Sequence, residues 1–181
     1  MKAYVTSIRE KTTGICCEQL EKFGFEVVLL DKEESWESKY KRFINIAHEA
    51  NEGCLRIDAD IIVNENIKHV GTALINDELI ASYNLYDLYR NGIFVGSPIF
   101  YTKKALGIIK RYHMMLHPSR PEASACRLDG INPYKFQSPL IVGMHGFFQD
   151  YVTIKRAKTN KTDRKQQGVF DFELVDKLMN L

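Results

Sequence analysis

The sequence is poor in the features that mark membrane-spanning and nucleic-acid-binding proteins. None of its apolar runs approaches the ~18 residues that a membrane-spanning helix needs, so the sequence predicts no such helix. Positive and negative charges nearly balance, because the sequence has 25 Lys and Arg residues and 23 Asp and Glu residues, a net charge of +2. That balance gives no general argument for binding nucleic acid.

Cysteine is also scarce. The four cysteines, Cys16, Cys17, Cys54 and Cys126, form no C-x-x-C pair, which disfavours a zinc site. We interpret them as reduced and mostly buried thiols. The segment 1–9 is interrupted by charge too early for a secretory signal peptide, so we expect a cytoplasmic protein.

What the sequence does contain is an ordinary globular balance, with 45% hydrophobic and 27% charged residues over 181 positions. This length suits a single domain with one sizeable core, so we predict one domain over residues 1–181. Strand-like segments at 2–8, 25–30 and 54–57 alternate with helix-like segments at 12–23 and 38–51. Because strands joined by helices run parallel, this order predicts an α/β fold with a mostly parallel, Rossmann-like sheet flanked by helices.

The later part of the chain has a less regular pattern. We predict one or two strands over 79–89, a strand, turn and strand over 92–101, a helix over 103–117, mainly loop over 119–139, and short strands at 139–143 and 151–154. We assign 119–139 to loop because proline and glycine residues recur in it.

Polar residues follow the predicted parallel strands. Thr6 and Ser7 follow the first strand, Asp31 follows the second, and Asp58 and Asp60 follow the third. Ligands bind at the carboxyl ends of strands in open α/β sheets. Two carboxylates at i and i+2 suit Mg²⁺ or Mn²⁺, and such an ion neutralises charge on a departing diphosphate. A bare Asp-x-Asp is more often a solvated turn, so its surroundings have to support the metal site.

Those surroundings resemble a known family. In residues 41–66, a basic residue and an Asn lie on a helix that ends in Gly. An apolar strand, Asp58-Ala59-Asp60 and a Glu-Asn tail follow. The segment resembles GT-A glycosyltransferases, especially family-2-like ones, and the order is similar over 1–105. The resemblance implies a GT-A fold with a donor half at 1–105 and an acceptor and C-terminal part at 106–181. It also implies transfer of a sugar from a nucleotide-diphosphate sugar to an unknown acceptor, with Mn²⁺ or Mg²⁺ as cofactor.

The resemblance also implies roles for individual residues. Asp60 would be a catalytic metal ligand, and Asp58 would contact the metal or the ribose. The residues that it places beside the nucleotide or the donor sugar are Thr6, Ser7, Arg9, Asp31, Arg42, Asn45, Gly96 and Ser97. For Arg42 and Asn45, a surface charge and a local hydrogen bond are equally good interpretations. A plain hairpin turn is the alternative for Gly96 and Ser97.

Three residues later in the chain are further candidates. His145 lies between Gly143 and Gly146, and a late histidine commonly completes the metal site in GT-A enzymes. Imidazole suits Mn²⁺ better than Mg²⁺. Glu122 and Asp129 follow the helix at 103–117, where inverting relatives place an acidic base. Neither forms a clean Glu-Asp pair, so the sequence leaves the inverting or retaining outcome open.

A basic run at 155–165 contains six Lys or Arg residues and one Asp. A solvated loop is the usual meaning of such a run. Contact with the donor diphosphate, or with an anionic acceptor such as a lipid headgroup or nucleic acid, is the functional alternative.

Other functions are also compatible with an Asp-x-Asp pair at Asp58 and Asp60. In a phosphotransferase Asp58 would be the nucleophile and Asp60 the acid, but Ile62 stands where such families have Thr or Val. A nucleotidyltransferase normally carries a glycine-rich, basic loop after the first strand, which 6–10 lacks. A catalytically silent GT-A-like binding or scaffold protein is the third alternative.

Overall fold

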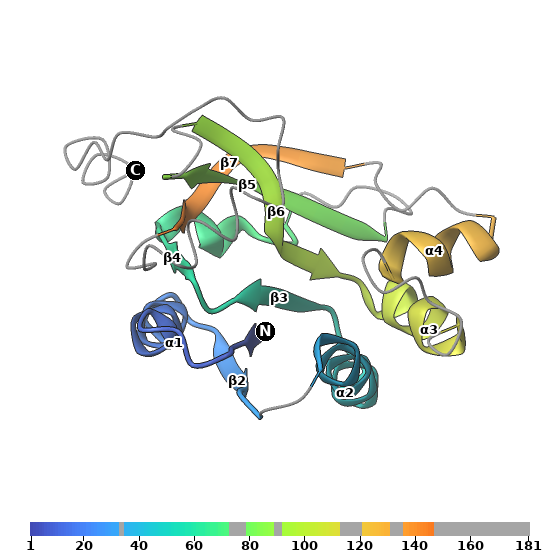
Figure 1. The fold of residues 1–181 in the computed structure, drawn as a ribbon. Coiled ribbons are helices and arrows are strands. Elements are labelled where there is room, and N and C mark those ends of the chain that lie inside the picture. Colours follow the sequence, from blue (N-terminus) through green and yellow to red (C-terminus); the bar gives the residue numbers. More distant parts are fainter. Residues whose placement is uncertain (33–34, 73–78, 89–91, 113–120, 131–135, 147–181) are drawn as a thin grey trace, which may run out of the picture.

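A seven-stranded sheet runs through the part of the chain that the computed structural model describes, residues 1–32, 35–72, 79–88, 92–112, 121–130 and 136–146 (Figure 1). The strands are β1 (Lys2–Thr6), β2 (Glu26–Leu30), β3 (Cys54–Asp58), β4 (Ile61–Val63), β5 (Ile80–Asp87), β6 (Gly92–Tyr101) and β7 (Phe136–His145). The helices are α1 (Thr13–Lys22), α2 (Trp36–Glu49), the 3₁₀ helix η1 (Glu65–His69), α3 (Lys103–Tyr112) and α4 (Pro121–Leu128). In these ranges no helix combines the length and the apolar character needed to cross a membrane.

The strand order is β2-β1-β3-β6-β5-β7-β4. Pairing is parallel between β1 and β2, β1 and β3, and β5 and β7, and antiparallel at the other three contacts. Because β6 is antiparallel to both β3 and β5, the strands β1, β2, β3, β5 and β7 all point the same way. Their carboxyl ends therefore meet along one edge of the sheet, and the predicted α/β fold is confirmed.

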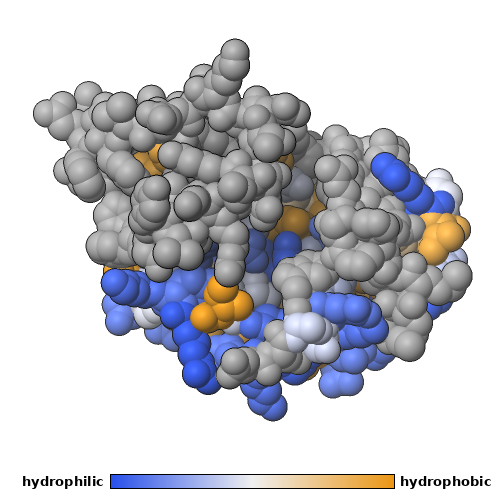
Figure 2. Space-filling model, in the orientation of Figure 1, coloured by the Kyte–Doolittle hydropathy of each residue, from blue (hydrophilic) through white to orange (hydrophobic). Residues whose placement is uncertain are grey.

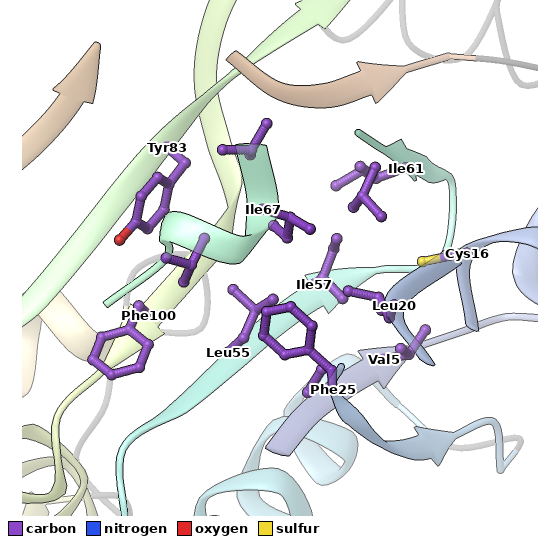
Figure 3. Close-up of a cluster of buried hydrophobic side chains, with 14 of the residues drawn as sticks. Val5, Cys16, Leu20, Phe25, Leu55, Ile57, Ile61, Ile67, Tyr83 and Phe100 are labelled. Atoms are coloured by element: carbon purple, nitrogen blue, oxygen red, sulfur yellow. The ribbon is translucent and has the colours of Figure 1, made fainter. Parts of the chain in front are cut away.

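Helices cover both faces of the sheet. One face packs under α1 and η1, where Cys16, Leu20 and Ile67 join strand residues such as Leu55 and Ile57 in a buried hydrophobic cluster (Figure 3). The other face packs under α2, α3 and α4, with Phe43, Ile44, Leu106 and Ile109 among its buried residues. Alternate residues of each strand feed these two cores, which fixes the register of the sheet.

Local signals explain the helix boundaries. Helix α2 begins at Trp36, two residues before the predicted start, because the Ser35 hydroxyl accepts a hydrogen bond from the Ser38 N–H at 3.2 Å and caps the helix. Thr12, the N-cap residue of α1, makes no capping hydrogen bond through its side chain. Its hydroxyl instead donates to the Ala59 carbonyl at 2.7 Å. That bond ties the start of α1 to the turn between β3 and β4.

Two predictions about the later segments are wrong. Residues 92–101 form one strand, β6, because a register shift against β5 absorbs the extra residues at Ser97 and Pro98. The stretch at 119–139 is not mainly loop, since it contains α4 and the start of β7. The strand predicted at 151–154 and the basic run at 155–165 lie outside the described residues.

The described surface is mainly hydrophilic on the face that Figure 2 shows, and its hydrophobic residues occur as separate spots. Scattered apolar residues of this kind are normal on a folded protein.

Gly143→Ala is expected to destabilise the protein by about 1–3 kcal/mol, the usual cost of overpacking. A Cβ at Gly143 would lie 2.5 Å from the carbonyl oxygen of Ile62 and 3.0 Å from Cα of Val63, so β4 would be pushed away from β7. Urea unfolding measures the cost. Gly14→Ala is the control, because nothing lies within 4 Å of its added Cβ and alanine favours the helix. Equal stability of the two variants would contradict the close pairing of β4 and β7.

Candidate functional site

A cavity of about 320 Å³ opens at the carboxyl edge of the sheet. It is lined by Thr6, Ser7, Ile8, Glu10, Lys39, Asp58, Asp60, Ile61, Leu85, Phe94, Ser97 and His145. Six of the residues predicted from the sequence are in this set: Thr6, Ser7, Asp58, Asp60, Ser97 and His145. The alignment of the five co-directional strands explains why such distant residues meet here.

Asp58 is held in place by neighbouring strands. The Thr6 hydroxyl donates to Asp58 Oδ1 at 2.7 Å, and the Asp58 N–H donates to Ser97 Oγ at 3.0 Å. The guanidinium of Arg56 lies 3.9 Å from the same Oδ1, with its own side chain buried. The Asp58 side chain is 44% exposed, so a fixed carboxylate faces the cavity.

The turn between the two aspartates is anchored on both sides. The Ala59 N–H donates to the Thr6 carbonyl at 2.9 Å, and the Ala59 carbonyl accepts from Thr12. Ala59 itself is fully buried. The chain therefore reverses at Ala59, and β4 departs to pair with β7 instead of continuing beside β1.

Asp60 contacts His145 because of that pairing. The register sets Ile61 opposite His145, and Asp60 Oδ2 lies 3.0 Å from His145 Nε2. On the other side of the ring, Asp87 Oδ2 lies 3.6 Å from Nδ1, and Asp87 is opposite His145 in the parallel pairing of β5 with β7. Burial lowers the pKa of His145, but the hydrogen bonds and charges of Asp60 and Asp87 outweigh it and raise the pKa to about 9. Without a metal ion, the imidazole is therefore a cation between two carboxylates at neutral pH.

The loop from β1 to α1 forms another wall of the cavity. Glu10 organises it: one carboxylate oxygen accepts from the Ser7 hydroxyl at 2.7 Å and from the Ile8 N–H at 2.8 Å. The Arg9 N–H donates to Ser7 Oγ at 2.8 Å, and Arg9 has a positive φ of 67°. Side-chain hydrogen bonds thus hold the tight conformation of this loop, which contains no glycine.

The donor atoms suit a hard divalent cation. Carboxylates are preferred by Mg²⁺ and Mn²⁺, and imidazole adds a ligand that Mn²⁺ accepts. Within the described ranges, no group of three or more His, Cys, Asp or Glu side chains is arranged to hold a metal ion. An ion at this site would therefore need further oxygen ligands, which phosphate and water provide.

No model of a known protein family matches the sequence, and no curated protein is similar to it. Solved structures are similar. A glycosyltransferase involved in the glycosylation of the major capsid of PBCV-1 has a TM-score of 0.54 and 12% identity, covering 87% of this chain and 98% of that chain. The 4-diphosphocytidyl-2C-methyl-D-erythritol synthase from Anaerococcus prevotii has a TM-score of 0.52 and 9% identity, covering 89% of this chain and 95% of that chain.

The chain has a GT-A-type fold. At these identities the likeness concerns the fold, which serves both glycosyl transfer and nucleotidyl chemistry in the two enzymes. Because a fold does not fix a function, a function for this GT-A-type chain has to be inferred from the residues of the cavity.

Several residues predicted for the nucleotide are not among those that line the cavity. They are Arg9, Asp31, Arg42, Asn45 and Gly96. Arg9, Asp31 and Asn45 are exposed. On α2 the first turn lies nearest the carboxyl edge, and each further residue rises about 1.5 Å along the helix, so Asn45 lies roughly 9 Å beyond Lys39. Lys39 lines the cavity in place of Arg42 and Asn45.

Gly96 has a packing role in this GT-A-type sheet. It lies inside β6, and a Cβ there would be 2.4 Å from the tip of the Phe94 ring. Glycine leaves room for Phe94, which lines the cavity and lies 6.0 Å from the His145 ring between centroids. The predicted turn at this position is wrong, and the neighbouring Ser97 is the residue that reaches the cavity.

Glu122 and Asp129, the candidates for an acidic base, are not among the residues that line the cavity. Glu122 is buried and accepts a hydrogen bond from the Tyr40 hydroxyl at 3.4 Å. Asp129 accepts from Arg111 at 2.8 Å and from the Tyr112 hydroxyl at 3.0 Å. Both carboxylates therefore belong to the packing of α2, α3 and α4.

Three charged residues of the site were not predicted from the sequence. Asp87 ends the strand-like segment predicted at 79–89, so the rule that located Asp58 applies to it as well. Glu10 lies three residues after Ser7, a spacing at which its carboxylate reaches back to the loop. Lys39 gave no signal, because only the packing of α2 under the loop turns it toward the cavity.

Proposed function

We propose that this protein is a metal-dependent glycosyltransferase that moves a sugar from a nucleotide-diphosphate sugar to an acceptor. The observation that carries the proposal is the gathering of Asp58, Asp60 and His145 in one cavity at the carboxyl edge of a GT-A-type sheet. The cavity is polar on the side of the aspartates and includes apolar walls at Leu85 and Phe94. Such a mixture suits a ligand with both charged and ring-shaped parts.

In this proposal Asp60 and His145 would hold Mn²⁺ or Mg²⁺, and Asp58 would contact the ion through water or bind the ribose. Asp60 Oδ2 and His145 Nε2 lie 3.0 Å apart, so both side chains could contact one ion. Asp87 would then fix the ring of His145 through Nδ1, as carboxylates commonly do for metal-bound histidines. The ion would supply charge neutralisation for the departing nucleoside diphosphate.

The test is release of nucleoside diphosphate from UDP- and GDP-sugars, measured with Mn²⁺, with Mg²⁺ and with chelator. We expect slow hydrolysis of at least one donor that needs the metal, because water substitutes for an absent acceptor. Calorimetry with UDP and GDP should show binding that largely disappears in chelator. Equal binding and turnover in chelator would contradict the metal-dependent proposal and favour the imidazolium of His145 as the resident cation.

Nucleotidyl transfer is the second candidate, because a cytidyl-compound synthase has the same fold. The loop at 6–10 weighs against it, since Glu10 puts a carboxylate where triphosphate chemistry favours glycine and positive charge. Release of inorganic diphosphate from CTP or UTP with a sugar phosphate, and no turnover of nucleotide sugars, would support this candidate instead.

A further inference from the structure

Lys39 is an unusual cation in the cavity wall. It lies in the first turn of α2, is only 5% exposed and lines the same cavity as Asp58 and Asp60. Its ammonium group donates a hydrogen bond to the carbonyl oxygen of Ser7. That bond uses one of the three donors of the ammonium and holds the side chain under the loop from β1 to α1.

The ammonium has no counter-ion in the described part of the chain, where no carboxylate lies within the 4.0 Å of an ion pair. Glu10 lines the same cavity, but its carboxylate is engaged by Ser7 and Ile8. A buried cation is costly unless a charged partner accompanies it. Among the described residues, the ammonium of Lys39 is therefore a buried charge at the cavity without a carboxylate in contact.

We propose that Lys39 binds a phosphate oxygen of the nucleotide, on the β1 side of the cavity. This inference rests on the nucleotide binding of the proposed function and adds a second, metal-free contact to the phosphates. Asp58 and Asp60 are anionic and need an intervening ion to face a phosphate, whereas Lys39 contacts it directly. A charge-assisted hydrogen bond of this kind accounts for about 10- to 100-fold in affinity.

A purely structural role is the competing explanation, in which Lys39 only supports the carbonyl of Ser7. The two roles differ in what they do to ligands. Structural support would affect every ligand that touches the loop, and it would do so through the shape of the cavity. Phosphate binding affects ligands in proportion to their charge and weakens with salt.

The experiment is calorimetric titration of wild type, Lys39→Met and Lys39→Arg with inorganic diphosphate, UDP and GDP at fixed free Mn²⁺. Methionine keeps much of the length and apolar stem, and arginine keeps the charge. Lys41→Met is the matched control, because Lys41 is on the same helix, pairs with Glu37 at 2.7 Å and is not among the residues that line the cavity. Urea unfolding of each variant reports any loss of stability.

We expect Lys39→Met to weaken inorganic diphosphate and any nucleotide that wild type binds by the same factor, about 10- to 100-fold. Lys39→Arg should recover most of the affinity, and Lys41→Met should match wild type. A loss confined to one nucleotide means that Lys39 contacts the base and overturns the proposal. Unchanged binding of diphosphate by Lys39→Met also overturns it, while metal-dependent nucleotide binding by wild type would leave the proposed function standing. Absence of diphosphate and nucleotide binding in wild type would overturn both.

Discussion

Asp60→Asn is expected to reduce the metal-stimulated release of nucleoside diphosphate by at least about 100-fold, the upper range for perturbing the support of a bound metal. Asparagine keeps the shape of the side chain but removes the charge that attracts the ion. Asp129→Asn is the matched control, because Asp129 also pairs with a cation, Arg111, but lies away from the cavity. The assay is turnover of a nucleotide sugar over a range of Mn²⁺ concentrations.

The same variant is also expected to lose stability, since Asp60 is a partner of His145 as well as a candidate ligand. A hydrogen bond between charged groups contributes about 1.5–3 kcal/mol, so we expect a loss of that order at pH 7 without metal. At pH 9.5 the imidazole is largely neutral and the loss should be smaller. Full metal-dependent activity in Asp60→Asn, or equal loss in Asp129→Asn, would contradict the assignment of Asp60.

The stability of the metal-free protein is expected to fall as the pH rises through about 9. The pKa of His145 is raised from 6.5 to about 9 in the folded protein, with burial opposed and outweighed by Asp60 and Asp87. A raised folded-state pKa gives a stabilisation that is complete below pH 6.5 and is lost as pH passes the folded value. The difference corresponds to about 3 kcal/mol at most. Urea unfolding between pH 6 and pH 10 measures the slope.

His145→Gln should remove this part of the pH dependence, because glutamine does not titrate. Asp87→Asn should reduce it, since one of the two carboxylates that hold the proton is lost. The pH dependence of Mn²⁺ binding should have the opposite sign to that of stability. Because Nε2 must lose its proton before it binds an ion, Mn²⁺ affinity should rise with pH up to about 9, and binding should release a proton. An unchanged slope in His145→Gln would contradict the location of the proton on this imidazole.

The parallel part of the fold could be predicted because its signals are local. Alternating strand-like and helix-like segments fix the order of β1 to β3, and polar residues after apolar strands mark the carboxyl edge. The position of Asp58 and Asp60 at the carboxyl edge could therefore be predicted, and the resemblance over 41–66 adds the expectation of a metal. His145 depended on the family pattern alone, and the structure places it beside Asp60.

The remainder depends on packing between distant segments, which a single sequence does not reveal. The direction in which Lys39 points is set by the position of α2 under the loop after β1. Glu122 and Asp129 follow the helix at the predicted place, but α4 packs them against α2 and α3, away from the cavity. The local sequence around Gly96 fits either a turn or a strand in which glycine leaves room for a neighbouring aromatic ring. The close approach of the Phe94 ring to Gly96, which only the structure shows, identifies the strand.

The anchored turn at Ala59 also has a consequence for the order in which the site forms. Asp58 is positioned through Thr6, whereas Asp60 meets His145, which lies 85 residues further along the chain. Contacts between residues so far apart form late, because the intervening chain has to be ordered first. We infer that β1, β3 and the Asp58 half of the site form first, and that the pairing of β4 with β7 completes the cavity. An intermediate with only the first half would bury part of each core and would lack the contact between Asp60 and His145.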